Sequence, residues 1–399
     1  MKIINGGVAA PKGFLASGVH CGIKKKKKDL ALIYSEKPAV CAGFFTSNKV
    51  KAAPVLLDMQ RVHSSEEFYA IIVNSGNANA CTGLKGMSDA RNMASYTAGL
   101  LDVNEQEVLV SSTGRIGELL PMPKIKNGIK EAADALSKDG GNDAAIAIMT
   151  TDLVKKEIAV EFKIGKKNVR IAGIAKGVGM IHPGLATMLC FITSDAHITR
   201  PALTGALKEC IDKTFNMITI DGERSTNDTV LVLANGMAGN NAIIKKSKDY
   251  AIFSKALGFV CTSLAKKIIY DGEGATKFIE IKVKGAKTFE DAKDAAFAVA
   301  KSSLVKTAMF GQDPNWGRIV SAMGNSKAHF VMEKVDVSLN GVMVLRNGAP
   351  IPAARNKARV LLKEQNIDIK VDFKMGKEEA TVWTSDLSYG YVKINAAYT

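Results

Sequence analysis

The sequence lacks the features that mark membrane-spanning, secreted or disulfide-stapled proteins. In 399 residues no apolar run approaches the roughly 18–20 residues that a membrane-spanning helix requires. The opening residues hold no apolar segment typical of a secretory signal peptide. The six cysteines form no C-x-x-C pair, and the chain is too long to depend on disulfides. We therefore expect reduced, mostly buried thiols in a cytoplasmic protein that does not bind a membrane.

Signatures of metal, nucleotide and serine-hydrolase chemistry are also absent. The five histidines form neither H-E-x-x-H nor a cluster with cysteine, which argues against a metal site. No G-x-x-x-x-G-K-[ST] loop and no G-x-S-x-G turn occurs, and the glycine-rich loops do not present G-x-G-x-x-G between a strand and a helix. The common nucleotide-binding and nucleophile-elbow enzymes are therefore excluded.

The charge is strongly positive. Against 39 Asp and Glu stand 54 Lys and Arg, for a net charge of +15, and Lys24–Lys28 is a run of five lysines that we expect in an exposed turn or at a strand edge. A basic nucleic-acid-binding protein is one hypothesis, although only 6% of residues are aromatic and no stacking motif is present. A basic surface equally fits an acidic small-molecule substrate.

The periodicity predicts an α/β protein whose stacked sheets are covered by helices. Hydrophobic residues make up 47% of the chain, enough for a sizeable core. Several neighbouring strands have connections of hairpin length, which favours layered sheets over a simple βαβ repeat. The segments on which this rests are strands within 68–83 and 106–122, a hairpin over 158–177 around Gly165, and helices over 125–141, after Asp89, and over 289–311.

One loop suggests chemistry. In KGVGMIHPGLATMLCFITSDA (176–196), a segment rich in glycine and proline delivers Ala186 and Thr187 into an apolar strand. A threonine becomes a good nucleophile when it is the first residue of a chain, because its own α-amine then takes the hydroxyl proton. Thr187 would gain that amine if the preceding bond were cut after an acyl shift to its hydroxyl. By spacing alone it is also compatible with an ordinary strand threonine.

The same loop strongly resembles the self-cleaving segment of the ornithine acetyltransferase family, the bifunctional glutamate N-acetyltransferases. Further segments resemble that family in the same order along essentially the whole chain. They are VNSGNANACTG (73–83), SSTGRIGELLPM (111–122), MTTD (149–152), TIDGERSTNDTVLVLANG (219–236), DGEGATKF (271–278), AMFGQDPNWGRI (308–319) and DLSYGYVKINAAYT (386–399).

The resemblance implies a precursor that cuts itself between Ala186 and Thr187. The products would be an α chain, 1–186, and a β chain, 187–399, that begins with the threonine nucleophile. Thr113 and Gly114 match the family's oxyanion hole, since a hydroxyl and a backbone N–H can both point at a developing negative oxygen. The implied substrate contacts are Thr150, Lys176, Thr187, Glu273, Asn395 and Thr399.

The resemblance further implies a ping-pong transfer of the acetyl group of N-acetylornithine to glutamate through an ester on Thr187, in arginine biosynthesis. No metal or redox cofactor is expected, since the amine and the oxyanion donors perform the proton transfer and charge stabilisation. Some members of the family also accept acetyl-CoA. The expected assembly is an α2β2 heterotetramer, without nucleic acid or membrane partners. An amidohydrolase or aminopeptidase with an N-terminal nucleophile is the enzymatic alternative, distinguished by whether water or an amine resolves the acyl-enzyme.

Overall fold

The computed structural model describes residues 1–183 and 188–397. The chain divides into two compact units, which are described separately. The first unit comprises 1–178, 184–216 and 224–268, and the second comprises 179–183, 217–223 and 269–399. Among the described residues, no helix is long and apolar enough to cross a membrane.

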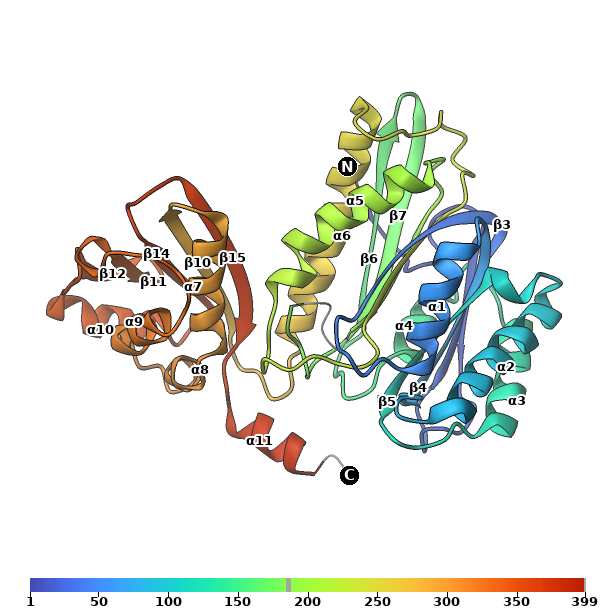
Figure 1. Cartoon of the computed structure of the whole chain (residues 1–399), viewed down its shortest axis with the longest axis horizontal. Coiled ribbons are helices and arrows are strands. Elements are labelled where there is room, and N and C mark those ends of the chain that lie inside the picture. The colour runs from blue at the N-terminus through green and yellow to red at the C-terminus, as the bar shows by residue number, and fades with distance from the viewer. Residues whose placement is uncertain (184–187, 398–399) are drawn as a thin grey trace. The chain divides into compact units, whose positions relative to one another are not determined.

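The first unit is built from strands packed between helices (Figure 1). Its hydrogen-bonded strand order is β1-β6-β7-β8-β9-β3-β4-β5, with β2 paired to β3. The strands are β1 Lys2–Ile4, β2 Phe14–Val19, β3 Leu30–Phe45, β4 Phe68–Asn77, β5 Val108–Arg115, β6 Lys156–Ile164, β7 Lys167–Lys176, β8 Leu189–Ser194 and β9 Thr229–Ala234. The helices are α1 Ala53–Ser64, α2 Gly83–Leu101, α3 Met122–Asp134, α4 Gly141–Ala147, α5 Arg200–Lys213 and α6 Lys248–Tyr270, the last of which ends in the second unit.

The long strand β3 links two layers of this sheet. Its first half pairs with β2 and β4, and its second half pairs with β9. Because successive side chains of a strand point to opposite faces of the sheet, alternate residues of β3 face different cores. Leu30 and Leu32 pack with α1, α2 and α3. Ala31 and Ile33 face an inner core that also holds Phe191 from β8. This alternation produces the layered sheets between helices, and the α/β prediction is confirmed.

The second unit is a separate sheet with its own helices. Its strand order is β13-β12-β11-β14-β10-β15, in which β10 pairs in parallel with β14 and antiparallel with β15. The strands are β10 Phe278–Ala286, β11 Asp336–Leu339, β12 Val342–Arg346, β13 Ala349–Pro350, β14 Asn366–Asp372 and β15 Glu378–Ser385. The helices are α7 Phe289–Lys301, α8 Ser303–Phe310, α9 Trp316–Gly324, α10 Arg355–Leu361 and α11 Tyr389–Ala396.

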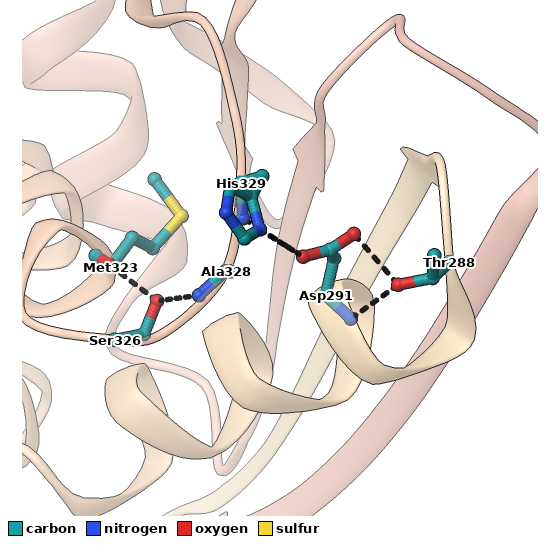
Figure 2. Close-up of polar contacts among 6 residues, drawn as sticks. All are labelled: Thr288, Asp291, Met323, Ser326, Ala328 and His329. Carbon is teal, nitrogen blue, oxygen red and sulfur yellow. Dashed lines mark hydrogen bonds and ion pairs between the residues drawn. The ribbon is translucent and has the colours of Figure 1, made fainter.

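The start of α7 is fixed by a local polar cluster (Figure 2). The Thr288 hydroxyl accepts from the Asp291 N–H, and the Asp291 carboxylate in turn accepts from the backbone N–H of His329 at 2.9 Å. The His329 N–H and the Thr288 hydroxyl, which donates to the Asp291 Oδ2 at 2.7 Å, lower the pKa of Asp291 to about 2. The cap therefore ties the segment that follows α9 to the first turn of α7.

Two predicted helices differ from those observed, and each difference has a packing reason. The segment 125–141 is not one helix, because α3 ends at Asp134 and the pair Gly140–Gly141 lies where α4 begins. A Cβ on Gly140 would lie 1.8 Å from the carbonyl oxygen of Ala16, so glycine permits this close approach. The predicted helix 289–311 is divided, since Ser302 ends α7 and caps α8.

Other sequence predictions hold. The predicted hairpin is β6 and β7, paired antiparallel around Gly165 at φ +57°. The helix after Asp89 exists but begins earlier, at Gly83. All six cysteines are free thiols, four of them buried. In the lysine run, Lys25–Lys27 are exposed as expected, whereas Lys24 and Lys28 are partly buried.

Candidate active site

The oxyanion residues proposed from the sequence lie at the end of β5. This strand pairs in parallel with β4, so that Thr113 lies opposite Ser75 and Gly114 opposite Gly76. Thr113 is buried. Gly114 has φ +136°, and a Cβ there would lie 2.2 Å from the carbonyl carbon of Gly76. Only glycine fits this close approach of the two strands, which explains the residue type that follows Thr113.

A buried lysine lies beside Thr113. Lys176, the last residue of β7, is 3% exposed and donates from its Nζ to the Thr113 Oγ1 at 3.3 Å. The structure therefore brings together two residues that the sequence places 63 positions apart. An ammonium and a hydroxyl on one side of a buried site are suited to binding an anionic oxygen or a substrate carboxylate.

Asp152 organises the backbone around this lysine. Its Oδ1 accepts from the Lys156 Nζ at 2.6 Å and from the Gly177 N–H at 2.9 Å. Its Oδ2 accepts from the N–H of Thr150, another proposed substrate contact, at 3.0 Å. Burial alone would raise the pKa of Asp152, but the charges of Lys176 and Lys156 hold this pKa below its usual range. Asp152 is therefore a carboxylate that links Thr150 to the residue after Lys176.

A third lysine adds positive charge nearby. The Lys24 Nζ donates to the carbonyl oxygens of Met149 at 2.6 Å and Lys28 at 2.8 Å. Burial lowers the pKa of Lys24 to about 8, although Asp29 opposes this shift and Lys176 adds to it. This part of the first unit is therefore rich in buried ammonium groups, which favours a substrate that carries carboxylates.

Two further residues of this unit hydrogen-bond to the backbone of residues that are adjacent in sequence to proposed catalytic residues. Asn227 and Asp228 directly precede β9 and are both buried. Asn227 hydrogen-bonds to the carbonyl oxygen of Ser112, and Asp228 to the N–H of Met188. Both residues lie in the motif TIDGERSTNDTVLVLANG (219–236), but no local sequence pattern predicts contacts over 115 and 40 positions.

The second unit contains the other pair of proposed contacts that the structure describes. Glu273 is 8% exposed, and its Oε2 accepts from the Nδ2 of Asn395, on α11, at 3.0 Å. Gly179 packs directly against this carboxylate, since a Cβ there would lie 2.6 Å from the Glu273 Oε2. Glu273 and Asn395 are thus brought together, as the resemblance implies.

Asp221 holds the chain that leads toward the predicted cleavage site. Its carboxylate accepts from the N–H groups of Met180 at 2.6 Å and Ile181 at 3.0 Å, and from the Tyr391 hydroxyl at 3.2 Å. Burial and the charge of Asp221 raise the pKa of Tyr391. The segment 179–183 is therefore fixed within the second unit by hydrogen bonds to its backbone.

The remaining predicted site residues lie outside the described part of the chain. These are Ala186 and Thr187, which flank the predicted cleavage bond, and Thr399. Within the described ranges, no group of three or more His, Cys, Asp or Glu residues is arranged to hold a metal ion.

The buried ammonium of Lys176 and the hydroxyl of Thr113 can both donate to an anionic oxygen, which is the kind of donor that an acyl-transfer enzyme needs. Comparison with known sequences gives the particular family. The model of the ArgJ family matches residues 15–399, and this chain belongs to that family. The resemblance stated from the sequence motifs is thereby confirmed.

Its relatives align over the whole chain. It is 52% identical over 402 residues to the arginine biosynthesis bifunctional protein ArgJ of Caldanaerobacter subterraneus, with all of both chains covered. It is 50% identical to the protein of the same name from Symbiobacterium thermophilum, again with both chains covered. A crystal structure of the arginine biosynthesis bifunctional protein from Bacillus halodurans is 40% identical, with a TM-score of 0.43, and covers 47% of this chain and 98% of its own.

Proposed function

We propose that this protein transfers the acetyl group of N-acetylornithine to glutamate through an acetyl ester on Thr187. The broader prediction, an acyltransferase of arginine biosynthesis, is confirmed by the family to which the chain belongs. The observation that carries the specific proposal is the buried contact between Lys176 and Thr113, next to a position that only glycine can occupy.

The reaction begins with self-cleavage. The Thr187 hydroxyl attacks the carbonyl carbon of Ala186, the C–N bond breaks, and the acyl group moves from nitrogen to oxygen. Water then hydrolyses the ester. This leaves a carboxylate on Ala186 and a free amine on Thr187, and that amine serves as the base for the threonine hydroxyl.

Acetyl transfer repeats the same chemistry on the substrate. The Thr187 hydroxyl attacks the acetyl carbon of N-acetylornithine, the amide C–N bond breaks, and the released nitrogen takes the proton to give ornithine. The amine of glutamate then attacks the acetyl ester and regenerates the hydroxyl. Each step forms a tetrahedral oxyanion, for which Thr113 and Gly114 supply the donors.

The charges of the two units support amino-acid substrates. The buried lysines around Asp152 favour carboxylates, and Glu273 favours an ammonium group. The proposal assigns substrate contacts to Thr150, Lys176 and Thr187, and, in the C-terminal half, to the set Glu273, Asn395 and Thr399. It includes a cytoplasmic α2β2 heterotetramer and no metal or redox cofactor. Acetyl-CoA is a second donor to be tested in the same assay.

The proposal is tested with purified protein on a denaturing gel and in an acetyl-transfer assay. Cleavage before Thr187 divides 42.6 kDa into bands of about 20 and 23 kDa, and Thr187→Ala should remain at full length. The cleaved protein should form N-acetylglutamate and ornithine from N-acetylornithine and glutamate, with parallel-line ping-pong kinetics. Release of acetate without acetylglutamate would identify a hydrolase instead. Binding to nucleic acid that weakens steeply with salt would favour the other alternative.

A further inference from the structure

The sequence Ser225-Thr-Asn-Asp-Thr229 contacts both strand β5 and the residue that precedes strand β8. Asn227 and Asp228 are 5% and 1% exposed, and neither is among the residues to which the resemblance assigns a role. Asn227 serves β5, and Asp228 serves the residue that precedes β8.

Asn227 fixes the backbone next to Thr113. Its Nδ2 donates to the carbonyl oxygen of Ser112 at 2.9 Å and to that of Ala78 at 2.6 Å. Ser112 is bonded directly to Thr113, and its hydroxyl donates to the Oδ1 of Asn74 at 2.6 Å. The strand end that carries Thr113 is therefore held both by Asn74 of the neighbouring strand β4 and by Asn227, which lies outside both strands.

Asp228 fixes the residue that follows Thr187. Its Oδ1 accepts from the Met188 N–H at 3.1 Å, and the next residue, Thr229, donates its own N–H to the Met188 carbonyl oxygen at 3.1 Å. Both polar groups of the Met188 backbone are thus bound by two consecutive residues. The parallel pairing of β8 with β9 begins directly afterwards, at Leu189 and Thr229.

The carboxylate of Asp228 has polar neighbours besides Met188. Its Oδ2 is buried, and the hydroxyl groups of Thr46 and Ser225 interact with this carboxylate. Burial raises the pKa of Asp228 well above its usual range, while the hydrogen bond from the Met188 N–H, the hydroxyls of Thr46 and Ser225 and the charge of Lys176 act to lower it.

We propose that Asp228 is a positioning residue for acyl transfer, which acts through the backbone of Met188 and ties it to the strand end that carries Thr113. This inference rests on the function proposed above, since it assumes that the threonine before Met188 is the nucleophile. Reacting groups displaced by about 1 Å lose roughly a hundredfold in rate, so a residue that sets this register affects the rate more than substrate affinity.

The test compares Asp228 with Asp58, a matched control in the same unit. Asp58 is also buried, and its Oδ1 also accepts one backbone N–H, from Val110 at 2.9 Å. The variants are Asp228→Ala, Asp228→Asn, Asp58→Ala and Asp58→Asn. Each is assayed for thermal unfolding, for the extent of self-cleavage, and for kcat and KM per cleaved chain.

We expect Asp228→Ala to lower kcat about a hundredfold while KM for N-acetylornithine changes less than threefold. Asp228→Asn keeps an acceptor for the Met188 N–H, so its kcat should be at least tenfold higher than that of Asp228→Ala. Asp58→Ala should unfold at a lower temperature yet keep kcat within about twofold. A normal kcat in Asp228→Ala, or an equal loss of kcat in Asp58→Ala, would overturn the proposal.

If Asp228→Ala yields no active enzyme, the extent of self-cleavage on a denaturing gel still tests the proposal. Cleavage is itself an acyl shift onto the same threonine, so a cleavage defect in Asp228→Ala that is absent from Asp58→Ala supports the proposal. An equal defect in both variants would contradict it. If the wild-type protein cleaves but does not acetylate glutamate, the proposed substrates are wrong, and the cleavage comparison still decides the role of Asp228.

Discussion

Replacing Asp152 by asparagine is expected to destabilise the first unit by about 3–5 kcal/mol, the usual cost of removing one partner from a buried ion pair. The carboxylate and its partner Lys156 are both 0% exposed, with 2.6 Å between the Oδ1 and the Nζ. Asparagine preserves the shape and an acceptor for the Gly177 N–H, so the change removes mainly the charge.

The magnitude follows from two opposing contributions. At this separation and an effective dielectric constant of about 20, two unit charges attract by ~6 kcal/mol. Desolvating each ion costs several kcal/mol, so the intact pair contributes little net stability. In Asp152→Asn the Lys156 ammonium stays buried without its carboxylate. The loss is therefore set by the desolvation cost of that lysine, with a further contribution from the nearby charge of Lys176.

The assay is urea unfolding of a double-mutant cycle. Thr187→Ala serves as the background because it removes the hydroxyl on which the proposed self-cleavage depends, and the added changes are Asp152→Asn, Lys156→Met and the two together. The double variant should be more stable than Asp152→Asn alone, with a coupling free energy of ~2–3 kcal/mol. Additive effects of the two changes would refute the electrostatic account of this pair.

We also predict that the effect of Asp152→Asn on the unfolding free energy depends on pH. The pKa of Asp152 is lower in the folded state than in the unfolded chain, where it is about 3.9. The carboxylate therefore contributes its stability above pH 4, and this contribution is lost as the pH falls toward the folded pKa. The difference in unfolding free energy between the parent and Asp152→Asn should shrink below pH 4. A difference that stays constant from pH 7 to pH 3 would contradict the assignment.

Two other predictions concern Gly114 and Lys306. Gly114→Ala would place a Cβ 2.2 Å from the Gly76 carbonyl carbon, and kcat for acetyl transfer should fall at least a hundredfold; an unchanged kcat would argue against an oxyanion role. Burial lowers the pKa of Lys306 to about 8, so the folded chain binds fewer protons than the unfolded chain between pH 8 and about 10.4. Wild-type stability should gain from this group as the pH rises through that window, and urea unfolding of Lys306→Met should lack this contribution.

Local patterns were sufficient to predict much of the fold. The hairpin of β6 and β7 follows from two alternating strands around a glycine, and both its existence and its turn are confirmed. Helix boundaries depended on contacts far away in sequence. Gly140 and Gly141 indicated the end of a helix, whereas the close approach of Gly140 to Ala16 places them at the start of the next one.

The candidate site was likewise predicted only in part from the sequence. Motifs led to Thr113, Gly114 and Lys176 one by one, and the structure adds that Lys176 reaches Thr113. No sequence pattern predicts that Asp228 binds the backbone of Met188, because such a contact exists only after β8 and β9 have paired. The roles of the proposed site residues, and the division into 1–186 and 187–399, stay predictions.

The strand order has a consequence for what a cut before Thr187 would do. Strands β8 and β9 come after that bond, yet β8 is hydrogen-bonded to β7 and β9 to β3, both of which come before it. After such a cut, strands β8 and β9 of the 187–399 chain would lie between strands β7 and β3 of the 1–186 chain. The two chains could separate only if the hydrogen bonds of β8 to β7 and of β9 to β3 were broken. Cutting the peptide bond would therefore free an amine while the sheet holds the two chains together.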